Sequence, residues 1–271
     1  YCEGSTITLS ANGTGGTAFA WSGPNGYTAN VANPTIANST TANAGTYNVT
    51  LTNPTTGCSV EASTIVNVNA NPVVTASNTG AYCAGQTIEL SAVSSDATSF
   101  AWSGPNGYAS AQQNPVIANA VTNNGGSYTV VATNANNCSA QASTVVTVNA
   151  NPTANASNTG AYCEGQTITL QTTATGTYVW SGPNGFSSTL QNPTIANATD
   201  ANAGTYTLVV SNANSCTAEA TTVVVVNASP TVTASNTGGY CADQTIVLSL
   251  VSADATSFAW NGPNGFTSNV Q

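Results

Sequence analysis

Apolar and polar side chains alternate over short stretches of this chain. Single polar residues separate Ile88, Leu90 and Ala92, and the same alternation places Tyr128 and Val130 on one face of a later stretch. A period of two residues is typical of a β-strand that buries one face. Thr, Ser, Asn and Val supply much of the rest of the chain, and these residues favour strands and turns. The pattern therefore predicts an all-β protein.

The same order of strands and turns recurs along the chain. A Tyr-Cys pair ends at Cys2, Cys83, Cys163 and Cys241, at intervals of 78 to 81 residues. Each pair is followed by an alternating stretch, an aromatic-x-Trp stretch and a Gly-Pro-Asn-Gly turn. Self-similarity at this period indicates tandem domains of about 80 residues. Because each has about seven short strands and regular turn signals, we expect every repeat to form an antiparallel β-sandwich.

An Asn-Gly pair follows a Pro in every repeat, at residues 25–26, 106–107, 184–185 and 264–265. Asn and Gly adopt positive φ angles more readily than other residues do. We therefore predict a tight reversal with left-handed backbone at each of these four pairs.

The repeats predict four domains along the chain. Residues 1–70 form the first repeat, which lacks its first strand, and residues 71–150 and 151–228 form the second and third. Residues 229–271 correspond to the N-terminal half of a fourth repeat. Half a sandwich cannot bury its own core, so we expect its partners to be further repeats of the same chain or other copies of it.

The charge composition excludes several classes of function. The chain has no Lys, Arg, His or Met, and its nine Asp and Glu residues give a net charge of −9. Nucleic-acid binding needs cationic side chains, and the usual nucleophile and proton-transfer systems need His or Lys. No run of 18 apolar residues is present, so no membrane insertion is predicted. We expect no nucleic-acid partner, no cofactor, no catalytic residue and no enzymatic activity.

Several motifs resemble the immunoglobulin-like sandwich. The order is Gly-x-x-Ile-x-Leu, then Trp, then Asn-Ala-Gly-Thr-Tyr at residues 43–47 and 202–206, with a variant at residues 124–128. The Trp corresponds to strand C of that fold and the Tyr to its tyrosine corner. This resemblance implies a tandem array of immunoglobulin-like antiparallel β-sandwiches. It also implies that the core contains Trp21, Trp102, Trp180 and Trp260, with Tyr47, Tyr128 and Tyr206.

A narrower resemblance comes from the sequence motifs of the repeats. The motifs Cys-x-Gly-x-x-Ile, Trp-Ser-Gly-Pro-Asn-Gly and Asn-Pro-x-Ile-Ala-Asn resemble those of Ig-like and PKD-like repeats. Such repeats occur in giant cell-surface adhesins or filaments of Bacteroidota, which are exported by type IX secretion. This resemblance implies an extracellular location at the cell surface. Modules of this kind serve as spacers, adhesive heads or filament shafts, so the fold alone does not fix the function.

The cysteines do not occupy the positions of the antibody disulfide. Those positions hold residues such as Ala11 and Val49, whereas the disulfide candidates lie before strand B and after the F–G turn, at Cys2, Cys58, Cys83, Cys138, Cys163, Cys216 and Cys241. In an immunoglobulin topology these two places are at opposite ends of one sandwich, roughly 30 Å apart, whereas a disulfide needs Cα atoms within about 7 Å.

Two pairings of the cysteines follow from this topology. Domains joined end to end would bring the cysteine before strand B of one repeat to the F–G turn of the next, which gives the pairs Cys2–Cys138 and Cys83–Cys216. The alternative is a bond within each repeat, which gives the pairs Cys2–Cys58, Cys83–Cys138 and Cys163–Cys216. The cysteines have no C-x-x-C spacing, so no metal site is predicted.

The aromatic residues after the Gly-Pro-Asn-Gly turns are candidates for glycan contact, namely Tyr27, Tyr108, Phe186 and Phe266. Exposed rings at these places would stack on sugars, and buried rings would instead pack under the turn. The leading hypothesis is a structural repeat region that forms a stiff extracellular shaft of a bacterial surface adhesin or filament. The alternative is a set of carbohydrate-binding Ig-like modules that mediate adhesion to polysaccharide, with glycans as partners.

Overall fold

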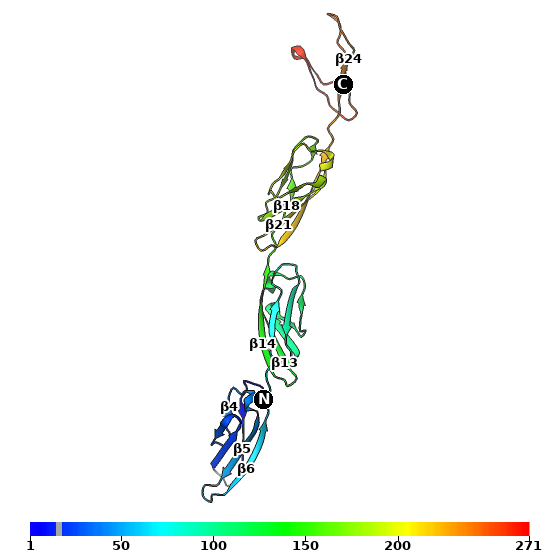
Figure 1. Ribbon diagram of the computed structural model, residues 1–271. Coiled ribbons are helices and arrows are strands. Elements are labelled where there is room, and N and C mark those ends of the chain that lie inside the picture. The colour runs from blue at the N-terminus through cyan, green and yellow to red at the C-terminus, as the bar shows by residue number, and fades with distance from the viewer. Residues whose placement is uncertain (15–17, 271) are drawn as a thin grey trace. The chain divides into compact units, whose positions relative to one another are not determined.

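The computed structural model describes residues 1–14 and 18–270 of the chain (Figure 1). These residues form β-strands joined by turns and short 3-10 helices, so the prediction of an all-β protein is confirmed. The chain divides into two compact units, Tyr1–Ala150 and Asn151–Gln271, which are described in turn. Within the described residues, no helix is long and apolar enough to span a membrane.

The second repeat contains two β-sheets packed face to face, the arrangement of the immunoglobulin fold. One sheet has the strand order β12-β9-β7 and the other has the order β11-β10-β13-β14-β8, in which β8 runs parallel to β14. The elements are β7 (Thr75–Asn78), β8 (Ala81–Cys83), β9 (Ile88–Val93), β10 (Ala97–Gly104), η3 (Pro105–Gly107), β11 (Tyr108–Ser110), β12 (Val116–Ile117), η4 (Thr122–Asn124), β13 (Gly126–Asn134) and β14 (Ser139–Asn149).

The alternation of apolar residues explains how these sheets face each other. On β9, Ile88, Leu90 and Ala92 are at most 1% exposed, and on β13 of the opposite sheet Tyr128 and Val130 are fully buried. The polar residues between them point outward, as a period of two requires. The predicted alternation is therefore confirmed, and the core of the repeat lies between the two sheets.

The first repeat has the same two sheets with fewer strands. One sheet has the order β1-β4 and the other has the order β3-β2-β5-β6. Its described residues contain no strand equivalent to β7, and a parallel bridge between Cys2 and Asn69 takes the place of the β8–β14 pairing. The elements are β1 (Ile7–Thr8), β2 (Ala18–Gly23), η1 (Pro24–Gly26), β3 (Tyr27–Ala29), β4 (Thr35–Ile36), η2 (Thr41–Asn43), β5 (Gly45–Thr52) and β6 (Ser59–Val66).

The unit Asn151–Gln271 holds the third repeat and the described part of the fourth. The third repeat has the strand orders β15-β17-β20 and β19-β18-β21-β22, with β16 parallel to β23. Its elements are β15 (Ser157–Asn158), β16 (Tyr162–Cys163), β17 (Ile168–Gln171), β18 (Thr177–Ser181), η5 (Pro183–Gly185), β19 (Ser187–Ser188), β20 (Thr194–Ile195), η6 (Asp200–Asn202), β21 (Gly204–Ser211), β22 (Thr217–Val224) and β23 (Val226–Asn227).

The fourth repeat consists of two antiparallel pairs, β24 with β25 and β26 with β27. Most of its side chains are exposed, in contrast with those of the complete repeats. Its elements are β24 (Thr233–Asn236), β25 (Leu248–Val251), β26 (Trp260–Asn261), η7 (Pro263–Gly265) and β27 (Thr267–Ser268).

A tryptophan and a tyrosine lie in the core of each of the first three repeats. Trp21, Trp102 and Trp180 are at most 4% exposed, and the tyrosines of the same cores are fully buried, at Tyr47, Tyr128 and Tyr206. Each buried indole N–H donates a hydrogen bond to a backbone carbonyl 10 or 11 residues later in the chain. The fourth tryptophan, Trp260, is half-buried.

The Asn-Gly pairs adopt the conformation that the sequence predicts. The φ angles lie between 55° and 57° for the four asparagines and between 69° and 75° for the glycines that follow them. Each pair forms the end of a short 3-10 turn that begins with Pro and leads into the next strand. The prediction of left-handed backbone at residues 25–26, 106–107, 184–185 and 264–265 is confirmed.

Candidate functional site

An extended set of contacts outside the cores joins the first and second repeats, within the unit Tyr1–Ala150. Strand β6 ends at Val66, and the chain enters the second repeat only a few residues later. The N-terminal residues run beside this segment, because the Asn69 N–H donates to the Tyr1 carbonyl at 2.9 Å and the Glu3 N–H donates to the Asn69 carbonyl at 3.0 Å. The segment between the repeats is therefore paired along its length and is not a free linker.

The F–G turn of the second repeat meets this segment from the other side. Asn134 ends β13, and its side-chain Oδ1 accepts hydrogen bonds from the backbone N–H groups of Asn136 and Cys138 at 3.0 and 3.1 Å. Asn137 has a φ of 59°, in the left-handed region that Asn tolerates better than most residues. Both features tighten the turn and hold Cys138 at its end, where the side chain is fully buried.

A disulfide joins the two repeats at this point. Cys2 is bonded to Cys138, their Cα atoms are 5.4 Å apart, and the bond links residues separated by 136 positions in the sequence. The Cα separation lies within the usual range for disulfides. The bond is the inter-domain pair that the topology predicts. It excludes the alternatives Cys2–Cys58 and Cys83–Cys138, because Cys2 and Cys138 are bonded to each other.

Hydrogen bonds from two asparagine side chains surround the disulfide. The Asn134 Nδ2 group donates to the Ala70 carbonyl at 3.0 Å, and the Asn71 Nδ2 group donates to the Glu3 carbonyl at 3.1 Å. Asn134 is only 9% exposed, so its bond is largely shielded from water. Leaving one partner of a buried hydrogen bond unpaired costs more free energy than the bond contributes. These contacts therefore restrict the junction in addition to the disulfide.

Sequence reasoning missed the asparagines of the junction. Asn134 orders its own turn through Oδ1 and contacts the first repeat through Nδ2. A signal was present, because an Asn also precedes the F–G cysteine of the first and third repeats, at Asn53 before Cys58 and at Asn212 before Cys216. The alternation of apolar residues does not detect such a position, since it marks cores and not turns.

Three of the remaining cysteines are exposed free thiols, namely Cys58, Cys163 and Cys241. Cys163 therefore does not form the intra-domain pair with Cys216. The pair Cys83–Cys216, which repeats the Cys2–Cys138 pattern one domain later, stays a prediction.

The turn aromatics pack against the tyrosine corners. The rings of Tyr27 and Tyr47 meet edge to face with centroids 5.4 Å apart, and the rings of Tyr108 and Tyr128 do the same at 5.4 Å. Phe186 and Tyr206 form the third such pair, also at 5.4 Å. Tyr27, Tyr108 and Phe186 are half-buried, while Phe266 in the fourth repeat is 47% exposed. Glycan contact by these rings stays a prediction.

The tyrosine corners are also closed by hydrogen bonds. The hydroxyl groups of Tyr47, Tyr128 and Tyr206 each donate to the carbonyl of the residue four positions earlier, at 2.9 Å. Burial raises the pKa of all three phenols, because it disfavours the charged form. The nearby Tyr27 and Tyr108 add to the increase at Tyr47 and Tyr128. These tyrosines therefore remain neutral donors in the folded protein at neutral pH.

No family model and no curated protein sequence matches the chain. An I-band fragment of titin is 17% identical, with a TM-score of 0.45 over 84% of this chain and 94% of that chain. Extracellular domains 3–5 of Drosophila OTK are 14% identical, with a TM-score of 0.38 over 83% of this chain and 93% of that chain. The full ectodomain of mouse nectin-like molecule 4 is 17% identical, with a TM-score of 0.36 over 84% of this chain and 96% of that chain.

Proposed function

We propose that this chain is a structural repeat region that acts as a stiff extracellular shaft of a bacterial surface adhesin or filament, without catalysis. The observation that supports this most strongly is the junction between the first two repeats. A disulfide and two partly buried side-chain amide hydrogen bonds restrict rotation between the repeats, which is expected of a stiff spacer and not of a freely rotating linker.

The chemistry of the junction also supports an extracellular location. Structural disulfides form and persist in oxidising compartments and are rare in the reducing cytosol. Within the Cys2–Cys138 bond, Cys138 is fully buried and Cys2 is half-buried, so the folded protein shields one of the two sulfur atoms from reductants. Stability without a single Lys or Arg depends on apolar cores and strand pairing, and such a chain offers no cleavage site to trypsin-like proteases.

Distance measurements across the junction would test the proposed stiffness. One dye is attached to the free thiol of Cys58 and a second to an introduced Gln141→Cys, with Cys163 and Cys241 replaced by serine. Single-molecule energy transfer then compares the same molecules before and after reduction of the Cys2–Cys138 bond. We expect a narrow distance distribution that broadens on reduction.

A matched control carries Cys2→Ser and Cys138→Ser together with the same dyes. Its distribution should be broad from the start and insensitive to reductant, because the bond that holds the joint is already absent. A distribution that is equally broad with and without the disulfide would contradict the stiff shaft. Antibody labelling of intact cells would separately test the surface location.

A further inference from the structure

The two cysteines of the Cys2–Cys138 bond lie in different surroundings. Cys138 is fully buried, whereas Cys2 is half-buried. The Cys138 sulfur also lies 3.9 Å from each of two backbone carbonyl oxygens, those of Asn69 and Asn136. A reagent therefore has access to the bond from the side of Cys2, and reaches the Cys138 sulfur only after the surrounding segments move apart.

The F–G turn keeps Cys138 in its buried position. The Cys138 N–H donates to Asn134 Oδ1 at 3.1 Å, and the Asn134 N–H donates to the Cys138 carbonyl at 2.9 Å. The same asparagine reaches the first repeat through its bond to the Ala70 carbonyl. Exposure of the Cys138 sulfur therefore requires local unfolding of a turn that one asparagine holds by three hydrogen bonds.

Cys2 is fixed mainly through its backbone. Its carbonyl accepts hydrogen bonds from the Ser5 hydroxyl at 2.6 Å and from the Ser39 hydroxyl at 3.3 Å, and the residue forms a parallel bridge with Asn69. These contacts position the backbone without enclosing the whole residue, so Cys2 keeps part of its surface in water.

The same difference recurs at positions in the interior of the chain. Cys83 occupies the position of Cys2 in the second repeat, where strand β7 precedes it, and it is likewise half-buried. Cys216 is the counterpart of Cys138 in the third repeat. It is fully buried, and its sulfur lies 3.9 Å from the Asn214 carbonyl oxygen. A partly open cysteine before strand B and an enclosed cysteine after the F–G turn are therefore properties of the repeat.

We propose that the Cys2 sulfur is the site at which thiols and disulfides open and close this junction by exchange, with Cys138 as the leaving sulfur. A reagent thiolate attacks the Cys2 sulfur, forms a mixed disulfide with it and breaks the Cys2–Cys138 bond. Cys138 leaves as a thiolate and takes a proton from water. A second reagent thiolate then attacks the reagent sulfur of the mixed disulfide, which releases Cys2 and yields the reagent disulfide. Two thiols thus supply the two electrons.

The surroundings of Cys138 favour the closed junction. A buried sulfur that faces carbonyl oxygens stabilises negative charge poorly, so Cys138 is a poor leaving group. After the first step the F–G turn still holds Cys138 beside Cys2, and its attack on the mixed disulfide is intramolecular. This return reaction competes with the second reagent molecule. The junction therefore opens slowly in a mild thiol and closes readily once a disulfide reagent has reacted at Cys2.

Peptide mapping of the first exchange product would test this proposal. The chain carries Cys58→Ser, Cys163→Ser and Cys241→Ser, so the exposed thiols cannot take part. The folded protein is mixed with excess reduced glutathione and quenched in acid at early times, and mass spectrometry of pepsin fragments locates the bound glutathione. We expect adducts at Cys2 to exceed those at Cys138 about tenfold or more, which corresponds to about 1.4 kcal/mol for opening the turn.

The same reaction in concentrated urea is the control for the method. Unfolding exposes both sulfur atoms, so the two adducts should then form in similar amounts. Similar amounts in the folded protein, an excess of the Cys138 adduct, or no adduct at Cys2 before unfolding would overturn the proposal.

Asn134→Ala provides a second measurement, because this side chain positions Cys138. The share of adducts at Cys138 should rise toward its value in urea. Asn136→Ala is the matched control, since its side chain is exposed and its bond to Asn134 comes from the backbone N–H. An unchanged share in Asn134→Ala would overturn the positioning role. The proposal concerns regulation of the junction on which the proposed function rests. The energy-transfer experiment compares only the closed and the open bond, so its result does not depend on which sulfur reacts.

Discussion

Loss of the Cys2–Cys138 bond should destabilise the first repeat selectively. The Cys138 sulfur lies 3.9 Å from the Asn69 carbonyl oxygen, so the bond ties the start of the first repeat to its end through the F–G turn of the second. When the first repeat unfolds while the second stays folded, the closed loop therefore runs from residue 2 to about residue 69. The full separation of 136 residues applies only when both repeats unfold.

The size of this effect follows from the loop length. On the chain-entropy model, a loop of about 68 residues contributes about 4 kcal/mol at 25 °C, and the longer loop contributes about 5 kcal/mol. Measured contributions of disulfides commonly fall below the model, to about 2 to 4 kcal/mol. We therefore expect the variant Cys2→Ser/Cys138→Ser to lower the free energy of unfolding of the first repeat by about 2 to 4 kcal/mol.

Native-state hydrogen exchange by mass spectrometry would measure this loss. Peptides from β5 report on the first repeat, and peptides from β21 report on the third repeat in the same molecule. Exchange should accelerate in β5 and remain unchanged in β21. Cys163→Ser, which removes an exposed free thiol, is the control. A change of less than about 0.5 kcal/mol in β5 would refute the reasoning, because the loop would then not constrain the unfolded first repeat.

Three further predictions concern the tyrosine corners. Gly104→Ala would place a Cβ in collision with the Tyr128 ring and should lower the stability of the second repeat by about 1 to 3 kcal/mol in urea, whereas Gly239→Ala, with open space around it, should change stability by less than about 0.5 kcal/mol. Because burial raises the pKa of Tyr47, Tyr128 and Tyr206 above the value near 10 of the unfolded chain, stability should be constant below about pH 10 and should fall as pH rises further. Thermal unfolding between about pH 7 and 11.5 checks this, and an increase in stability above pH 10 would contradict it. Tyr108→Ala should cost about 2 to 4 kcal/mol through loss of its contact with Tyr128, while saturable polysaccharide binding that this variant abolishes without unfolding would support the carbohydrate-binding alternative.

The sequence predicts the cores and turns of this protein well, for a physical reason. Buried positions such as Leu90 and Tyr128 follow the two-residue period of a strand, and the Asn-Gly pairs adopt positive φ angles that these residue types favour. Each feature therefore depends on neighbours in the sequence. The pairing of Cys2 with Cys138 was one of the two pairings that the sequence left open, and the structure selects it.

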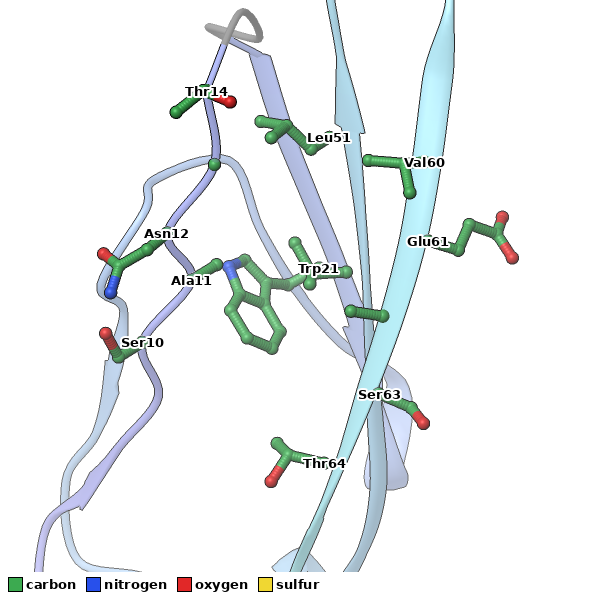
Figure 2. A pocket seen from close by; sticks show the side chains of 13 residues that line it. Ser10, Ala11, Asn12, Thr14, Trp21, Leu51, Val60, Glu61, Ser63 and Thr64 are labelled. Atoms are coloured by element: carbon green, nitrogen blue, oxygen red, sulfur yellow. The ribbon is translucent and has the colours of Figure 1, made fainter.

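Contacts that depend on three-dimensional neighbours were not predictable in this way. Asn134 has the appearance of an ordinary turn residue, and only the arrival of Ala70 beside it gives its Nδ2 group a second role. Likewise, the groove beside Trp21, between residues 10–14 and β6, could not be described without the position of β6 (Figure 2). Periodicity describes a strand, whereas these features arise where separate segments meet.

The Cys2–Cys138 bond also defines how tension would pass through the chain. A pull applied at Tyr1 reaches Ser139 through two sulfur atoms, so residues 3–137 carry none of the load while the bond is intact. Unfolding of the first repeat under that pull would not lengthen the molecule. Once the bond is reduced, complete unfolding of both repeats would let the chain between these two positions extend to about 450 Å, at about 3.3 Å for each of the 136 positions it spans. The oxidation state of one pair of cysteines therefore determines whether this part of the molecule can lengthen under tension.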